Sequence, residues 1–192
     1  MTEEERLATI GLFTEYNTDF AMQDEVRVRD IKSKFIIGFG TDVTKNPRYV
    51  LQLLDTAFNE KNAEDVENAL IIASMFNLIS KDYTNILLKL MESDWHFIHE
   101  DIASIFQELK LPNTVDCLFN AALSRFEYLE YDDSYALAVK CIWALGQIGT
   151  EESTEKLILL AQSQNEVIRE NALNQLKRRG LTSAGTPTVV ER

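Results

Sequence analysis

Two histidines three residues apart are the first candidates for chemistry in this sequence. They lie in the segment His96-Phe97-Ile98-His99-Glu100-Asp101. Residues three positions apart share one face of a helix, so the two imidazoles would be able to converge on a metal ion. The segment matches no established zinc pattern, and the alternative is that both histidines are structural. We therefore predict neither a metal site nor a bound cofactor.

The two cysteines, Cys117 and Cys141, each lie within an apolar pattern with helical spacing. That setting is typical of small buried hydrophobic residues, and a disulfide, metal-binding or nucleophilic role is the alternative. The sequence contains no phosphate-binding glycine-rich loop, no G-x-S-x-G elbow and no cysteine pair at two-residue spacing. Carboxylates are abundant, but abundance alone does not indicate an acid/base pair. We predict that the chain is not an enzyme.

An acidic, tyrosine-rich segment is the most unusual feature of the chain. It reads Glu127-Tyr128-Leu129-Glu130-Tyr131-Asp132-Asp133-Ser134-Tyr135. Tyrosine supplies a large contact area with few rotatable bonds, and carboxylates attract cationic groups, so this segment favours a basic protein partner. The alternative is a solvated loop whose tyrosines pack back on the helices. The predicted binding residues here are Glu127, Tyr128, Glu130, Tyr131, Asp132, Asp133 and Tyr135.

The charge of the chain supports the same kind of partner. Its 192 residues include 31 acidic and 19 basic residues, a formal net charge of −12. Residues 55–155 contain 19 acidic and 6 basic residues, so this middle region carries −13. Such a field repels nucleic acid and anionic lipid surfaces and attracts basic proteins. Lys177, Arg178 and Arg179 end the last predicted helix and complement its dipole, with a phosphate-binding patch as the alternative.

Location is predicted from two further features of the sequence. No run of about 18 apolar residues occurs, so we expect no transmembrane helix. The first residues, Met1-Thr2-Glu3-Glu4-Glu5-Arg6, are acidic where a secretory signal would be basic and then apolar. We therefore expect a cytoplasmic protein.

Apolar residues recur at helical spacing along nearly the whole chain. Two N-terminal helices are predicted over residues 5–16 and 24–39, and Pro47 suits the first turn of the next one. Gly180 to Arg192 has no periodicity and is predicted to be a flexible tail. The other predicted helices cover residues 47–59, 64–79, 82–92, 95–110, 113–127, 133–148, 151–163 and 166–179.

These helices form pairs that repeat. An apolar pair recurs in the first helix of each hairpin at intervals of 34, 31 and 39 residues: Leu53-Leu54, Leu87-Leu88, Leu118-Phe119 and Leu157-Ile158. The second helices are each preceded by an expected capping residue, Asn62, Asp94, Asp133 or Asn165. We predict that Leu54, Leu88 and Leu145 are buried.

Helical hairpins of this kind bury their apolar faces by stacking on their neighbours. We predict one all-α domain, an α-α superhelix of about four hairpins over residues 46–180, with residues 1–45 as a helical cap and 181–192 as the tail. Equivalent turns of stacked repeats line up along one edge. Trp95, in the turn equivalent to the acidic segment, is therefore added to the predicted binding residues, with a core position as the alternative.

The last two repeats resemble HEAT repeats, in the short form found in bilin-lyase-like proteins. The similar segments are Ala144-Leu145-Gly146-Gln147-Ile148-Gly149 and Asn165-Glu166-Val167-Ile168-Arg169-Glu170-Asn171-Ala172. His99 stands where this family usually has arginine. The resemblance implies a HEAT-like α-solenoid that binds a protein on its concave face, and it implies no chemistry of its own.

Acidity and resemblance together predict a module that binds a basic protein. One version is an immunity or inhibitor protein against a cationic toxin such as a nuclease. The alternatives are a bilin-lyase-like accessory protein and a general HEAT-repeat scaffold or regulatory protein. HEAT-like DNA glycosylases need a basic concave face, which this chain lacks.

Overall fold

The computed structural model describes residues 1–16, 24–131, 133–182 and 185. Helices and their connecting turns account for this described part, which contains no β-strand, so the predicted all-α class is confirmed. The chain divides into two compact units, Met1–Ile86 and Leu87–Arg192, and the division falls within helix α5 (Thr84–Met91). Within the described residues, no helix is both long enough and apolar enough to cross a membrane.

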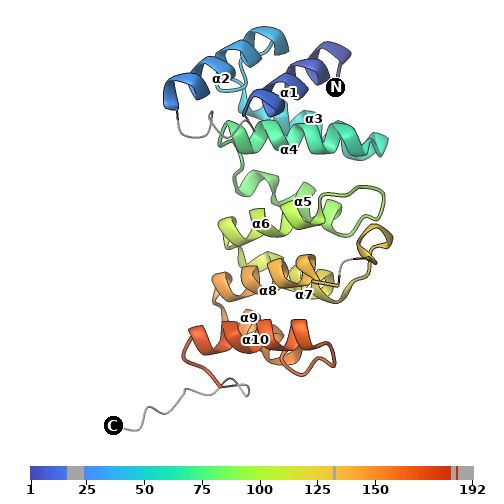
Figure 1. The fold of residues 1–192 in the computed structure, drawn as a ribbon, viewed down its shortest axis with the longest axis vertical. Helices are drawn as coiled ribbons and strands as arrows, with labels where there is room; N and C mark the ends of the chain where they lie inside the picture. The colour runs from blue at the N-terminus through green and yellow to red at the C-terminus, as the bar shows by residue number, and fades with distance from the viewer. Residues whose placement is uncertain (17–23, 132, 183–184, 186–192) are drawn as a thin grey trace. The chain divides into compact units, whose positions relative to one another are not determined.

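Four α-helices build the N-terminal unit: α1 (Glu3–Tyr16), α2 (Glu25–Phe39), α3 (Pro47–Glu60) and α4 (Ala63–Met75). Helix α1 pairs with α2, and α3 pairs with α4, while α1 also contacts α4 (Figure 1). Pro47 occupies the first turn of α3, as predicted. The expected N-cap Asn62 is confirmed, because its side chain accepts a hydrogen bond from the backbone N–H of Asp65.

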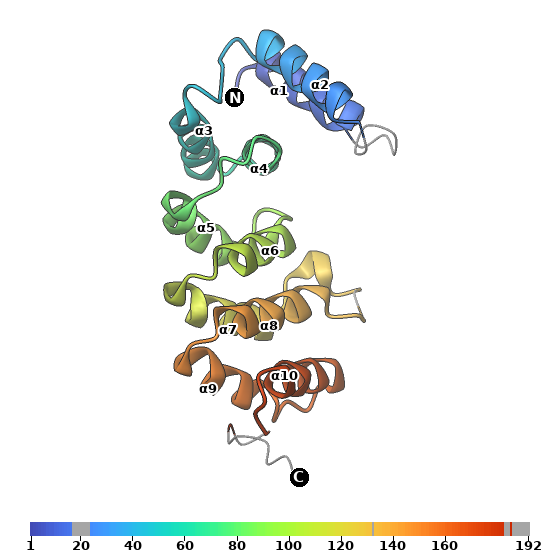
Figure 2. The same cartoon turned by 90° about the vertical axis from the view of Figure 1, so that its left-hand side faces the viewer.

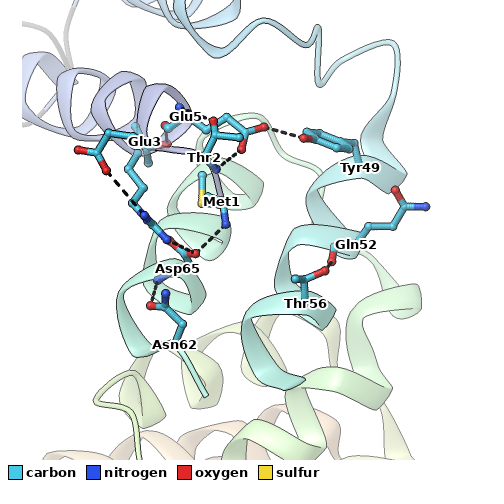
Figure 3. Close-up of polar contacts among 11 residues, drawn as sticks. Met1, Thr2, Glu3, Glu5, Tyr49, Gln52, Thr56, Asn62 and Asp65 are labelled. Carbon is cyan, nitrogen blue, oxygen red and sulfur yellow. Dashed lines mark hydrogen bonds and ion pairs between the residues drawn. The ribbon is translucent and has the colours of Figure 1, made fainter. Parts of the chain in front are cut away.

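A buried ion-pair network joins α1 to α4 (Figure 3). The Asp65 carboxylate is fully buried and accepts from Arg6 Nε at 2.7 Å and Arg6 Nη2 at 2.9 Å. The Met1 amino group lies 2.7 Å from the same carboxylate. Burial alone would raise the pKa of Asp65, but these donors lower it. The first helix is thus held on α4 by charge as well as by apolar packing.

The C-terminal unit is built from hairpins in two layers. Helix α8 (Ala136–Ile148) packs against α6 (His99–Leu109) on one side and α10 (Glu166–Arg178) on the other, while α7 (Val115–Leu123) and α9 (Glu151–Leu160) form the second layer (Figure 1, Figure 2). Asn165 caps α10 as predicted, since its side chain accepts from the N–H of Ile168. Short 3-10 turns lie at η2 (Lys81–Tyr83), η3 (Pro112–Thr114) and η4 (Glu127–Leu129).

The predicted core is correct at two of three positions. Leu54 and Leu145 are fully buried, but Leu88 is only half-buried, and Leu87 takes the buried place. The first repeat interval of 34 residues makes Tyr83 equivalent to Tyr49, which lies inside α3. Tyr83 instead belongs to a 3-10 turn, whose winding is tighter than that of an α-helix, so the helical register of the two segments differs.

Two of the expected N-cap residues were wrong, because the helices that follow them begin later than predicted. Helix α6 begins at His99 and α8 at Ala136, so Asp94 and Asp133 lie before the N-cap residues, which are Ile98 and Tyr135. The residues that were predicted to begin these two helices instead lengthen the turns before them. The segments predicted over residues 1–45, 46–180 and 181–192 stay a prediction, and residues 183, 184 and 186–192 of the expected tail lie outside the described part of the chain.

Candidate functional site

Two turns of the C-terminal unit come together and carry most of the predicted binding residues. One turn covers residues 92–98, before α6, and the other covers residues 124–131 and 133–135, between α7 and α8 (Figure 1, Figure 2). The ring of Phe97 meets the ring of Tyr128 edge-on, with 5.3 Å between centroids. Tyr128 also forms a hydrogen bond to His99 at the start of α6, at 2.9 Å. The tertiary structure therefore joins two segments that are thirty residues apart in sequence.

His99 is the residue that ties the two turns together. It is fully buried, and its ring lies against that of Phe126 with 3.7 Å between centroids. Its Nε2 lies 2.7 Å from the carbonyl oxygen of Ser93. A carbonyl oxygen only accepts, so Nε2 carries the proton, and Nδ1 accepts from the Tyr128 hydroxyl. Burial lowers the pKa of His99 to about 4, and the ring is neutral at pH 7.

His96 repeats this arrangement one turn away. Its ring is buried and stacks on that of His99 at 4.3 Å. Its Nε2 donates to the carbonyl oxygen of Leu90 at 2.8 Å, and its Nδ1 accepts from the N–H of Ile98 at 3.3 Å. All four ring nitrogens of the two histidines are thus engaged within the protein. The described residues contain no cluster of three His, Cys, Asp or Glu side chains suited to a metal ion.

The three tyrosines of the acidic segment differ in their exposure. Tyr128 turns inward and is half-buried, whereas Tyr131 is 82% exposed and Tyr135 is 37% exposed. Tyr135 has φ 53°, a left-handed conformation that is unfavourable for a bulky residue and that turns the chain into α8. Of the three tyrosines, Tyr128 therefore packs on the helices, as the alternative interpretation of the segment expected. Tyr131 and Tyr135 are accessible to a partner.

The acidic side chains of the segment face solvent. Glu127, Glu130 and Asp133 are exposed, and Asp132 lies outside the described residues. Burial, together with the nearby carboxylates of Glu100 and Asp101 on α6, raises the pKa of Tyr128 to about 12.

The exposed ring beside Tyr128 is that of Phe97, whereas the predicted binding residue Trp95 lies partly inside the protein. Trp95 is half-buried and meets the ring of His96 edge-on at 5.3 Å, while Phe97 is 66% exposed and lies against Tyr128. Phe97 was not predicted, because a helix starting near residue 95 would have included it. We name the set of exposed residues Phe97, Glu127, Glu130, Tyr131, Asp133 and Tyr135 the acidic–aromatic surface.

The cysteines and the two arginines singled out in the sequence are buried or make contacts within the protein. Cys117 and Cys141 are buried free thiols, and burial raises the pKa of both, that of Cys117 to about 12. Arg178 lies over the ring of Trp143 at 4.8 Å. Arg179 donates to the carbonyl oxygen of Gly149 at 2.9 Å and so ties the end of α10 to the end of α8.

Comparison with known proteins adds no assignment, since no protein-family model, curated protein or solved structure matches this chain significantly.

Proposed function

We propose that this chain is a non-enzymatic module, a HEAT-like solenoid, that binds a basic protein through the acidic–aromatic surface. The observation that carries the proposal is the juxtaposition of exposed rings and exposed carboxylates on one part of the C-terminal unit. Tyr131 is 82% exposed and Phe97 is 66% exposed, and Glu130 and Asp133 lie beside Tyr131 in the same turn. Exposed aromatic rings provide binding energy, and the carboxylates steer a cationic partner toward them.

The helix packing of the C-terminal unit supports the HEAT-like part of the proposal. Its second helices, α6, α8 and α10, lie side by side in chain order. Gly146, within the segment that resembles the HEAT motif, leaves room on α8 for the side chain of Gln175 on α10. A Cβ atom at Gly146 would collide with the side-chain amide of Gln175 on α10, which is itself buried.

An acidic binding module of this kind acts by covering a cationic site on its partner. We include an immunity or inhibitor protein against a cationic toxin, such as a nuclease, as the specific form of the proposal. The acidic–aromatic surface would then occupy the site where the toxin binds its polyanionic substrate.

The test compares protein capture by three forms of the chain. The wild type and two charge-neutralised variants are immobilised, and bound proteins from the native cell are identified and then measured by surface plasmon resonance. The binding-site variant is Glu127→Gln/Glu130→Gln/Asp133→Asn. The matched control removes the same charge from exposed positions of α9, as Glu151→Gln/Glu152→Gln/Glu155→Gln.

We expect a basic partner whose association rate falls several-fold at low salt for the binding-site variant and changes little for the control. Its association should also become less sensitive to salt in the binding-site variant. An acidic partner, or equal kinetics for both variants, would refute the proposal.

A further inference from the structure

A cavity of about 300 Å³ opens beside the acidic–aromatic surface, between residues of the turn that follows α7 and the first turn of α8. Apolar side chains line it: Ala122 at the end of α7, Phe126 and Leu129 in the following turn, and Leu137 and Ala138 in α8. Three of these are almost fully buried, with exposures of 3%, 4% and 5% for Ala122, Leu137 and Ala138. Part of the cavity wall is therefore hydrophobic core that solvent reaches through the opening.

Charged side chains line the same cavity from exposed positions. The carboxylates of Glu130 and Asp133 contribute two negative charges, and Arg125 contributes one positive charge, so the charged part of the lining is net negative. The ring of Tyr135, which is partly exposed, also faces this space. Apolar core surface and exposed carboxylates are thus combined in one recess.

We propose that this cavity receives a large apolar side chain of the partner, flanked in sequence by lysine or arginine. The inference rests on the proposed function and names the feature of the partner that the surface recognises. A cavity of about 150 Å³ is enough to hold a benzene ring, so the present volume accommodates a phenylalanine side chain. Apolar anchors that fill such pockets dominate the binding energy of many interfaces.

The position of the charges decides where the partner's cations lie. A cationic head group placed against Ala122, Leu137 and Ala138 would lose its hydration without gaining an acceptor there, which is unfavourable. The carboxylates of Glu130 and Asp133 are exposed, so they pair with cations that remain near solvent. The ligand chemistry that fits is therefore an apolar residue inside the cavity with basic residues beside it.

Short peptides test this inference directly. The ¹⁵N-labelled full chain is titrated with three peptides. The first is acetyl-Lys-Lys-Phe-Lys-Lys-amide, the second has alanine in place of phenylalanine, and the third keeps phenylalanine but has glutamate in place of each lysine. We expect saturable NMR shifts at the amides of Ala122, Leu129, Leu137 and Ala138 with the lysine–phenylalanine peptide. The affinity should fall about tenfold for the peptide with alanine in place of phenylalanine, and the peptide with glutamate in place of lysine should show no detectable binding.

Variants that fill the cavity are compared with a control variant that adds similar bulk outside it. Ala138→Leu fills it from α8, and Ser124→Leu fills it from an exposed lining position, so the second variant serves if the first does not fold. Gln147→Leu adds similar bulk to an exposed position of α8 outside the cavity lining. We expect Ala138→Leu or Ser124→Leu to lose peptide binding at unchanged helix content and Gln147→Leu to retain it.

Several outcomes would overturn the inference. Equal binding of the phenylalanine and alanine peptides, shifts confined to other residues, or full peptide binding by a folded Ser124→Leu variant would each do so. If the captured basic partner is weakened by the charge-neutralised variant but binds Ser124→Leu normally, the cavity inference fails and the proposed function stands. If the partner is unaffected by either variant, both fail.

Discussion

The hydrogen bond between Tyr128 and His99 makes the most direct prediction about how the acidic–aromatic surface is held. Tyr128→Phe removes the hydroxyl and keeps the ring, which packs edge-on against Phe97. The Nδ1 atom of His99 then has no donor, although the ring remains fully buried. The variant therefore measures the hydrogen bond separately from aromatic packing.

The expected loss follows from the burial of the two partners. An unpaired buried acceptor costs about 1–3 kcal/mol, and because Tyr128 itself is half-buried we expect a loss of about 1–2 kcal/mol in the free energy of unfolding. For a chain of this size, this loss lowers Tm by about 3–6 °C. Amide hydrogen exchange in the 124–131 segment should accelerate, because the turn loses its link to α6.

Tyr131→Phe is the matched control, because Tyr131 lies in the same turn and is 82% exposed. Removing that hydroxyl should leave Tm within about 1 °C of the wild type, as is usual for surface substitutions. Both variants are measured by thermal and urea unfolding followed by circular dichroism. Equal Tm values for Tyr128→Phe and the wild type, with unchanged hydrogen exchange, would refute the stabilising role of the Tyr128–His99 hydrogen bond.

Three further predictions concern protonation, the core and the thiols. Acidification from pH 6.5 to about 4 should destabilise the protein through His99 by up to about 3 kcal/mol, because the unfolded chain binds a proton that the buried ring does not. Urea midpoints plotted against pH should show this slope in the wild type and a smaller slope in His99→Gln, where burial still lowers the pKa of His96. Leu87→Asp should cost several kcal/mol and Leu88→Asp clearly less, since only Leu87 is fully buried; the reverse order in urea unfolding would refute the corrected register. Cys117 and Cys141 should react with a thiol reagent only as the protein unfolds, because burial raises the pKa of both; rapid labelling of the native protein would contradict this.

Helix positions were predictable from the sequence wherever local chemistry sets them. Pro47 starts α3, and Asn62 and Asn165 cap α4 and α10, because each acts on backbone groups within one turn of itself. Asp94 and Asp133 have suitable side chains but lie before the N-caps of α6 and α8. At these two positions the packing of the residues that follow, and not the capping propensity of the aspartate, sets where the helix begins.

The candidate site was predictable in part. The acidic segment stood out by composition, and three of its carboxylates, those of Glu127, Glu130 and Asp133, are exposed. The inward position of Tyr128 and the exposure of Phe97 had no signal in the sequence. The position of Tyr128 depends on its hydrogen bond to His99, which is 29 residues away along the chain.

The amino-acid sequence by itself determined the helical class and the acidity of the chain, because apolar spacing acts locally and charge adds up over the whole chain. Only the tertiary structure decided which turn residues face inward and where the cavity beside Leu137 opens. Those features arise from contacts between segments that are far apart in sequence, and a periodic pattern carries no information about which ring fills which space.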